Sequence, residues 1–253
     1  MLILESDYQK LYEIILNSNN IVFFGGAGVS TESGIPDFRS QTGLYNKENA
    51  TDYSPEYMLS HEFLIENSEE FSKYYKENLI YEDAKPNITH KVLKKLEEMG
   101  KLKAIITQNI DSLHQIAGST NVLEIHGNLR NYYCMRCGRE YPKEEILKTK
   151  GANYCDCGGY IRPDVVLYGE NLNQQIVKQS INAIAHADVL IIAGTSLVVY
   201  PAASFINFYN GNKSILINKE VYGDSSVANY VVEDEMGNFF GGLHDRLQGK
   251  EVD

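Results

Sequence analysis

The sequence predicts an α/β protein in which helices cover a mostly parallel sheet. Short apolar runs recur along the chain with helical patterns between them, an alternation typical of parallel sheets. A glycine-rich turn follows the first run at residues 25–28, and all four cysteines lie between Cys134 and Cys157. Few large apolar residues surround the cysteines, so we expect one large sheet domain and a small module stabilised by something besides an apolar core.

The apolar runs predict the strands, and helical periodicity predicts the helices. The expected strands are residues 21–24, 104–106, 122–125, 189–193 and 214–217. In residues 86–99, apolar side chains recur at helical spacing and Gly100 follows, so an amphipathic helix with a glycine C-cap is expected. Residues 172–185 and 202–209 are expected to form further helices.

Composition and charge limit the location and the partners of the protein. The 253 residues are 43% hydrophobic, with no apolar run long enough for a membrane span and no signal-peptide pattern, so a cytoplasmic protein is expected. The formal net charge of −11 opposes binding to nucleic acid and favours lysine-rich protein segments, although solubility alone also explains it. No membrane or nucleic-acid partner is expected, and a monomer is the default.

Residues 21–40 predict a nucleotide-binding turn. A buried strand runs into Gly25, Gly26 and Gly28, which let backbone N–H groups approach phosphate oxygens closely. The pattern is not that of a dinucleotide dehydrogenase, which needs a third glycine and an acidic residue at the end of a second strand roughly 20 residues on. The turn therefore predicts nucleotide binding of another kind.

Polar residues follow each predicted strand directly. They are residues 25–30, 108–111, 126–127 and 194–196, and Asn218. Open α/β sheets bind their ligands outside the carboxyl ends of the strands, so we expect these clusters to line one crevice. Their convergence is stronger evidence for a site than any one cluster.

The cysteines form two close pairs, Cys134 with Cys137 and Cys155 with Cys157, separated by 17 residues. This approaches the spacing of a zinc ribbon, although the second pair is shorter than usual. A Cys₄ site leaves no open coordination position, so the expected Zn²⁺ is structural. Four reduced thiols or a redox pair are the alternatives, which the pairing and the sequence context disfavour.

His126 is the expected general base of the crevice. An imidazole is the side chain best matched to removing a proton near neutral pH, and His126 lies at a strand end before Gly127. Asn109 and Asp111 can orient a ribose or a carboxamide from the neighbouring strand end. A strand cap is the plainer alternative for His126. The other histidines lack such neighbours and are expected at the surface or in packing: His61, His90, His114, His186 and His244.

Taken together, these motifs resemble those of the sirtuins, the NAD⁺-dependent protein lysine deacylases. The matching segments are GAGVSTESGIPDFRS at 26–40, TQNID at 107–111, HG at 126–127, the cysteine pairs, RPDVVLYGE at 162–170, GTSLVVYPA at 194–202, and Asn218. They follow the order typical of the family. The resemblance implies a Rossmann-like NAD-binding domain, a helical insert with a cofactor loop, and a zinc-binding module. The implied boundaries are 1–30, 86–127 and 164–253 for the NAD-binding domain, 31–85 for the insert and 128–163 for the module.

The resemblance also implies which residues bind NAD⁺. They are Ala27, Thr31, Phe38, Arg39, Gln108, Ile110, Asp111, His126, Thr195, Ser196, Asn218 and Met236. Phe38 would shield the nicotinamide ribose and Asn109 would orient the reacting ribose. Met236 would contact adenine through its backbone, and Zn²⁺ would bind the four cysteines.

By the same resemblance, the function is NAD⁺-dependent protein lysine deacetylation. The acyl oxygen would attack the ribose carbon that bears nicotinamide, which leaves, and His126 would then activate a ribose hydroxyl that attacks the imidate carbon. Water would complete the reaction, giving O-acetyl-ADP-ribose and free lysine. An acetyl-lysine peptide would pair with Val165, Val166 and Leu167 by strand addition. A protein ADP-ribosyltransferase or NAD⁺ hydrolase using the same site, and a silent NAD⁺ sensor, are the alternatives.

The insert also bears on acyl preference. Sirtuins that prefer succinyl or malonyl groups carry a tyrosine and, three residues on, an arginine in the insert helix. The aligned positions here are Ser72 and Tyr75. We therefore expect acetyl groups to be preferred over succinyl groups.

Overall fold

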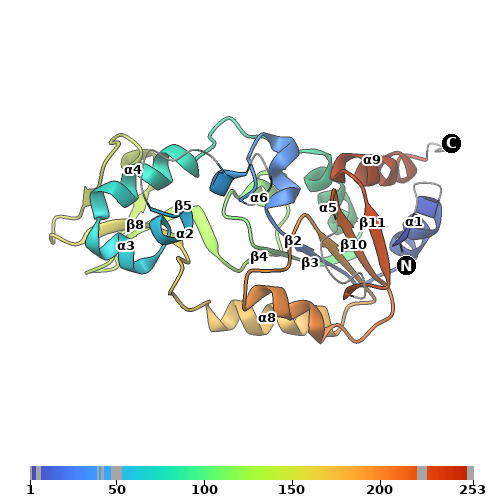
Figure 1. Ribbon diagram of the computed structural model, residues 1–253. Helices are drawn as coiled ribbons and strands as arrows, with labels where there is room; N and C mark the ends of the chain where they lie inside the picture. The colour runs from blue at the N-terminus through green and yellow to red at the C-terminus, as the bar shows by residue number, and fades with distance from the viewer. Residues whose placement is uncertain are drawn as a thin grey trace.

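The computed structural model describes residues 2–3, 7–38, 40, 43–46, 53–220 and 227–249. A large domain holds a parallel sheet between helices, and a small domain of helices and an antiparallel sheet lies beside it (Figure 1). The chain passes between the two domains more than once, so neither domain is one continuous segment. This architecture confirms the predicted α/β fold with a separate small module.

Within the described residues, the large sheet has seven parallel strands in the order β1-β11-β10-β9-β2-β3-β4. Their bounds are β1 Leu2–Ile3, β2 Ile21–Gly25, β3 Leu102–Thr107, β4 Val122–Glu124, β9 Val189–Ala193, β10 Ser214–Asn218 and β11 Tyr230–Glu233. All five predicted strands are confirmed. The apolar runs do not predict β1 and β11, which are short strands at one edge of the sheet.

Helices cover both faces of this sheet (Figure 1). On one face lie α1 Tyr8–Leu16, α5 Ile88–Glu98 and α9 Met236–Leu247, and on the other lie α8 Gln174–Ala185 and the 3₁₀ helix η4 Ala202–Phe208. Phe23 packs with Leu93 of α5 in the first core, and Phe24 packs with Ile184 of α8 in the second. Successive strand residues point to opposite faces, which explains why the β2 run is apolar throughout.

The helix boundaries follow from their caps. Asn87 accepts a hydrogen bond from Thr89 N at 3.0 Å, so α5 begins at Ile88, two residues later than predicted. The predicted helix at 202–209 is a 3₁₀ helix over most of its length. Ser204 donates its backbone N–H to the Pro201 carbonyl at 3.0 Å, the i+3 spacing that defines this tighter helix.

The small domain joins the cysteine module to the helices of the insert. Its antiparallel sheet, as far as the described residues show it, has the order β6-β5-β8-β7. The elements are β5 Gly127–Cys134, β6 Glu140–Pro142, α7 Lys143–Ile146, β7 Asn153–Tyr154 and β8 Tyr160–Val165, with helices α2 Pro55–Met58, α3 His61–Glu66 and α4 Ser68–Asn78. Phe71 and Tyr75 of α4 share a buried core with Tyr132 and Ile161 of the sheet. The module therefore gains stability from the insert helices as well as from its cysteines.

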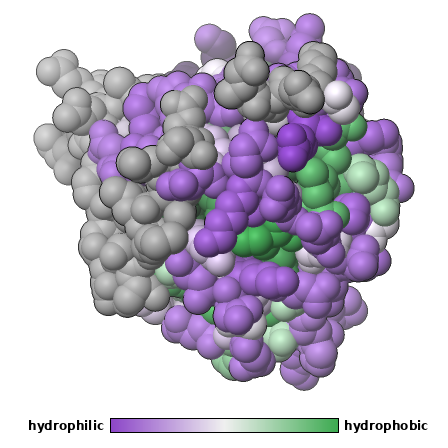
Figure 2. All heavy atoms as spheres, turned by 90° about the vertical axis from the view of Figure 1, so that its right-hand side faces the viewer, coloured by the Kyte–Doolittle hydropathy of each residue, from purple (hydrophilic) through white to green (hydrophobic). Residues whose placement is uncertain are grey.

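The face of the large domain that points away from the small domain is mostly hydrophilic. Figure 2 shows this face, where polar side chains predominate and smaller hydrophobic areas lie between them. None of the helices in the described ranges is long and apolar enough to cross a membrane.

Two buried histidines pack against each other between α5 and the short helix α6, Leu113–Ile116. The ring centroids of His90 and His114 are 4.7 Å apart, and His114 also contacts the ring of Phe23 edge-on. Burial lowers the pKa of His90 to about 4 and holds the pKa of His114 well below its ordinary value. Both rings are therefore neutral packing residues in the folded protein.

We expect the free energy of unfolding to fall as the pH is lowered from about 6.5 to about 4. In this window the unfolded chain takes up protons on both imidazoles while the folded chain does not, so acid favours unfolding. Urea denaturation at several pH values should show a flatter pH dependence for His114→Phe. His186→Ala, which removes an exposed histidine, is the control, and an unchanged pH dependence in the His114 variant would contradict the assignment.

Candidate active site

The carboxyl ends of four strands lie level at one edge of the large sheet. Gly25 of β2 pairs with Thr107 of β3 and with Ala193 of β9, and Ala193 pairs with Ile217 of β10. The predicted polar clusters lie at this edge, and the next residues along the four strands are Gly26, Gln108, Gly194 and Asn218. The strand register therefore brings these clusters side by side.

The glycine-rich turn after β2 packs directly against the turn after β9. Gly28 donates its N–H to the Gly194 carbonyl at 2.8 Å. A Cβ on Gly28 would lie 2.7 Å from Gly194 Cα, and a Cβ on Gly26 would lie 2.8 Å from the Gly194 oxygen. Glycine is needed because the two backbones touch, and the turn continues as the 3₁₀ helix η2, Ala27–Ser33.

Three of the predicted cofactor residues are joined by hydrogen bonds. Gln108 Nε2 donates to Thr195 Oγ1 at 2.9 Å, and Asn218 Nδ2 donates to the Thr195 carbonyl at 2.9 Å. The side chain of Ser196 is exposed beside them. Gln108 and Thr195 follow β3 and β9, and Asn218 is the last residue of β10. Together they form a polar surface that spans three strand ends and suits sugar and phosphate groups.

A second set of polar residues is largely buried beside the glycine turn. In this set, Ser30 of the turn is hydrogen-bonded to residues that follow β3. Asn109 Nδ2 donates to Ser30 Oγ at 3.1 Å, and Ser30 Oγ donates to Asp111 Oδ2 at 2.6 Å. Leu113 N donates to the other oxygen of the Asp111 carboxylate at 2.8 Å. Loss of solvent raises the pKa of Asp111, and these hydrogen bonds oppose that rise. The orientation of Asn109 is thus set by groups from two strand ends.

His126 is held by the backbone of the neighbouring strand end. Its Nδ1 lies 3.0 Å from the Gln108 carbonyl, which can only accept, so the neutral ring carries its proton on Nδ1 and leaves Nε2 as an acceptor. Burial lowers the pKa of His126, and the hydrogen bond to Gln108 offsets only part of this effect. The ring is therefore neutral at pH 7 and suited to accept a proton at Nε2.

The remaining predicted cofactor residues lie on several elements, except for Arg39, which falls outside the described residues. Ala27 and Thr31 are on η2, and Thr31 Oγ1 donates to the Gly28 carbonyl at 3.0 Å. Phe38 and Ile110 pack against the small-domain core, so they lie where the two domains meet. Met236 begins α9, and its side chain is buried in the large-domain core.

The segment predicted to pair with a peptide lies directly beside His126. Val166 donates its N–H to the His126 carbonyl at 2.9 Å, and Val165 pairs with Gly127 across β5 and β8. Gly127 has a φ of 73°, and a Cβ there would lie 2.0 Å from the Asp164 oxygen. The segment and His126 are therefore in backbone contact, and only glycine allows this approach.

The four cysteines converge at the far end of the small domain. Their sulfur atoms all lie within 4.8 Å of one another, with Cys134 Sγ 3.5 Å from Cys157 Sγ and Cys137 Sγ 3.6 Å from Cys155 Sγ. Tetrahedral Zn–S bonds of about 2.3 Å place sulfurs about 3.8 Å apart, whereas a disulfide needs about 2 Å. The cluster therefore fits a structural Zn²⁺ bound by four thiolates.

The sequence of this chain matches that of a known family over most of its length. A family model described as "Sir2 family" matches residues 26–201, which is more than half of the chain. The chain belongs to the Sir2 family. The match includes Gly26 and Gly28 of the glycine turn, His126 and all four cysteines.

Relatives of this sirtuin match it over nearly the whole length. The NAD-dependent protein deacetylases of Clostridium tetani and Clostridium perfringens are each 53% identical, over 94% and 96% of this chain and 98% and 100% of their own lengths. A solved structure described as "Sir2-p53 peptide-NAD+" is 36% identical with a TM-score of 0.84, over 96% of this chain and 99% of that one. The predicted family and its Rossmann-like fold with a zinc ribbon are confirmed.

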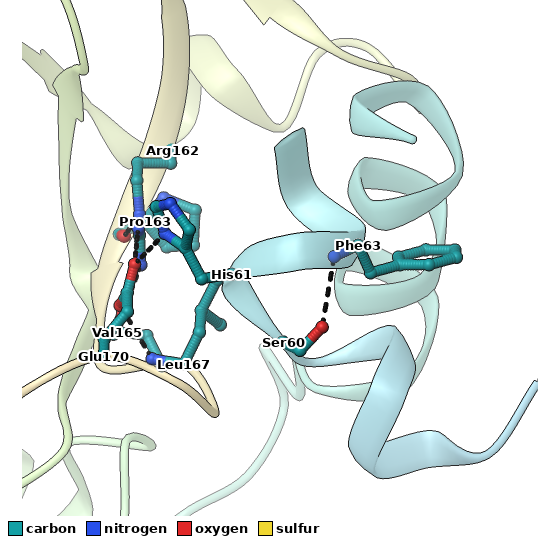
Figure 3. A network of polar contacts seen from close by, with 8 residues as sticks. All are labelled: Ser60, His61, Phe63, Arg162, Pro163, Val165, Leu167 and Glu170. Carbon is teal, nitrogen blue, oxygen red and sulfur yellow. Dashed lines mark hydrogen bonds and ion pairs between the residues drawn. The ribbon is translucent and has the colours of Figure 1, made fainter. Parts of the chain in front are cut away.

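Two groups of polar residues in this sirtuin were not predicted from its sequence. Ser30 lies in the GAGVS motif but was not assigned a role, although it joins Asn109 to Asp111. Glu170 binds both Arg162 and His61, as Figure 3 shows. The RPDVVLYGE motif contains both Arg162 and Glu170 and could have indicated their pairing. Nothing in the sequence marks His61, which lies 109 residues before Glu170.

We expect Cys137→Ser to reduce the zinc content of the sirtuin from about one ion per chain and to lower Tm by about 5 °C or more. The substitution removes one of four thiolates, and the turn after β5 loses its cross-link. Metal analysis and thermal unfolding would measure both effects. Met135→Ala, an exposed residue of the same turn, is the matched control, and full zinc retention with an unchanged Tm would contradict the assignment.

Proposed function

We propose that this sirtuin is an NAD-dependent protein deacetylase that transfers the acetyl group of an acetyl-lysine protein to ADP-ribose. The observation that carries the proposal is the position of His126. Its ring is hydrogen-bonded to Gln108 beside the Asn109 group, and its backbone is bonded to Val166 of the predicted peptide segment. The relatives named NAD-dependent protein deacetylase support the same activity.

NAD⁺ would supply a ribose whose bond to nicotinamide breaks as the acetyl oxygen takes its place. We propose that it is held by the residues that the family resemblance indicates: Ala27, Thr31, Phe38, Arg39, Gln108, Ile110, Asp111, Thr195, Ser196, Asn218 and Met236. The polar surface formed by Gln108 and Thr195 suits ribose hydroxyls and phosphate oxygens. Asn109, held by Ser30, would orient the reacting ribose.

His126 would then remove the proton from a ribose hydroxyl as that oxygen attacks the carbon of the former acetyl group, and water would complete the release of lysine. Its Nε2 is the acceptor, because Nδ1 donates to the Gln108 carbonyl. The lowered pKa of His126 keeps the ring neutral, which a base requires at physiological pH. The general-base role of His126 and the orienting role of Asn109 together form the proposed catalytic pair.

The substrate peptide would lie along Val165, Val166 and Leu167. Pairing with a backbone is tolerant of sequence, and the negative charge of the chain favours lysine-rich segments. The cytoplasmic location and the monomeric state stay predictions.

Mass spectrometry of NAD⁺ mixed with an acetyl-lysine peptide tests the activity. We expect nicotinamide, O-acetyl-ADP-ribose and free lysine peptide, and at least a roughly 100-fold lower kcat/KM for His126→Ala because the base is lost. His186→Ala should retain activity. Nicotinamide release without peptide would instead indicate an NAD⁺ hydrolase, and peptide carrying ADP-ribose would indicate a transferase.

We also expect kcat/KM for an acetylated peptide to exceed that for its succinylated form by about tenfold or more. A succinyl carboxylate needs a cation, and α4 offers none that is free. Ser72 and Tyr75 are buried, Lys73 pairs with Glu69, and Lys76 Nζ donates to the Gly151 carbonyl at 2.8 Å. Comparable kcat/KM values on the two forms of one peptide would contradict this expectation.

A further inference from the structure

The carboxylate of Glu170 accepts four hydrogen bonds at the junction of β8 and α3 (Figure 3). His61 Nδ1 lies 2.8 Å from Oε1, which also accepts from Arg162 Nη1. Arg162 Nη2 donates to Oε2 at 3.0 Å, and Leu167 N donates to the same oxygen at 2.9 Å. Every partner of the carboxylate is therefore a donor, and each oxygen receives two.

Hydrogen bonds from Arg162 and to Glu170 hold both ends of the peptide-pairing segment, residues 165–167. Arg162 is 3% exposed, and its Nη2 also donates to the Val165 carbonyl at 2.5 Å. At the other end, Leu167 donates its backbone N–H to the Glu170 carboxylate. The guanidinium of Arg162 and the carboxylate of Glu170 thus hold the backbone of Val165 and Leu167 on either side of Val166, whose N–H is bonded to His126.

The start of α3 and Leu59, just before this helix, hold the next residue, Tyr168, through backbone hydrogen bonds. The backbone of His61 donates to the Tyr168 carbonyl at 2.9 Å, and Tyr168 N donates to the Leu59 carbonyl at 3.0 Å. The side chain of His61 reaches the Glu170 carboxylate from the same place. The start of α3 therefore contacts the segment through its backbone and through Glu170.

We infer that Glu170 is a positioning residue that, with Arg162 and His61, holds residues 165–168 in the conformation that receives the substrate backbone. The inference rests on the proposed function, because it assigns these residues to peptide binding. A segment already ordered in the free enzyme loses less conformational entropy when a peptide pairs with it, so peptide affinity depends on the network. Within the described residues, the hydrogen bonds of these three side chains go to one another and to residues 163–167, whereas NAD⁺ would bind at the strand ends.

A carboxylate is required at this position, which makes a nearly isosteric test possible. Burial alone would raise the pKa of Glu170, but its hydrogen bonds to Arg162, Leu167 and His61 outweigh burial and lower the pKa, so the group is ionised. An amide would replace one acceptor oxygen by an NH₂ donor facing two other donors. Glu170→Gln therefore breaks the network with almost no change in volume.

We expect Glu170→Gln to weaken binding of a fluorescent acetyl-lysine peptide by about tenfold, measured by anisotropy, with NAD⁺ affinity and kcat little changed. His61→Ala removes only one of the partners of Glu170, an imidazole that is half-exposed to solvent. It should therefore weaken peptide binding less, by about threefold. His186→Ala, an exposed histidine on the large domain, is the matched control. Zinc content and Tm report on folding.

Unchanged peptide affinity in folded Glu170→Gln would overturn the inference, as would an equal loss of NAD⁺ affinity and kcat. If Glu170→Gln does not fold, the His61→Ala variant tests the inference instead. An unchanged peptide affinity in His61→Ala would then overturn it. The proposed function is tested separately by turnover of the unmodified chain. Peptide affinity is measured without turnover, so either proposal can fail while the other stands.

Discussion

The level ends of parallel strands determine where the reactive groups of this sirtuin lie. Gly25 pairs with Thr107 on one side and Ala193 on the other, so the loops that leave β2, β3 and β9 begin at the same height. A shift of one residue in β2 would exchange the side chains that face the two cores, so that Phe23 and Phe24 would each point to the wrong face. The cores on the two faces of the sheet therefore hold this register, and the polar residues that follow the strands meet as a result.

His126 connects this edge to the small domain. Ile125 donates its N–H to the Thr107 carbonyl at 3.0 Å on the large sheet, and the His126 carbonyl accepts from Val166. Strand β5 then runs from Gly127 beside the site to Cys134 in the metal cluster. The zinc cluster and the candidate base lie at opposite ends of one strand, so the metal can affect the site through the order of β5 and β8.

The parts of the fold that were predictable are those in which one segment carries its own signal. The run 21–24 is apolar at every position because both faces of β2 are buried, and the cysteine pairs have the spacing of a metal site. The sheet containing β5 and β8 was not predicted, because its strands alternate poorly and depend on Phe71 and Tyr75 of a distant helix. Its stability comes from contacts that no local pattern contains.

From its sequence alone, this protein could be assigned a parallel sheet, a glycine turn, a four-cysteine cluster and a histidine at a strand end. Each strand, turn and cysteine pair behind these assignments carries its own signal in residues close together in the chain. Only the tertiary structure joined Ser30 to Asn109 and Asp111, and His61 to Glu170. Hydrogen bonds between residues far apart in the chain form only because the elements pack together. The spacing of residues along the chain does not specify that packing.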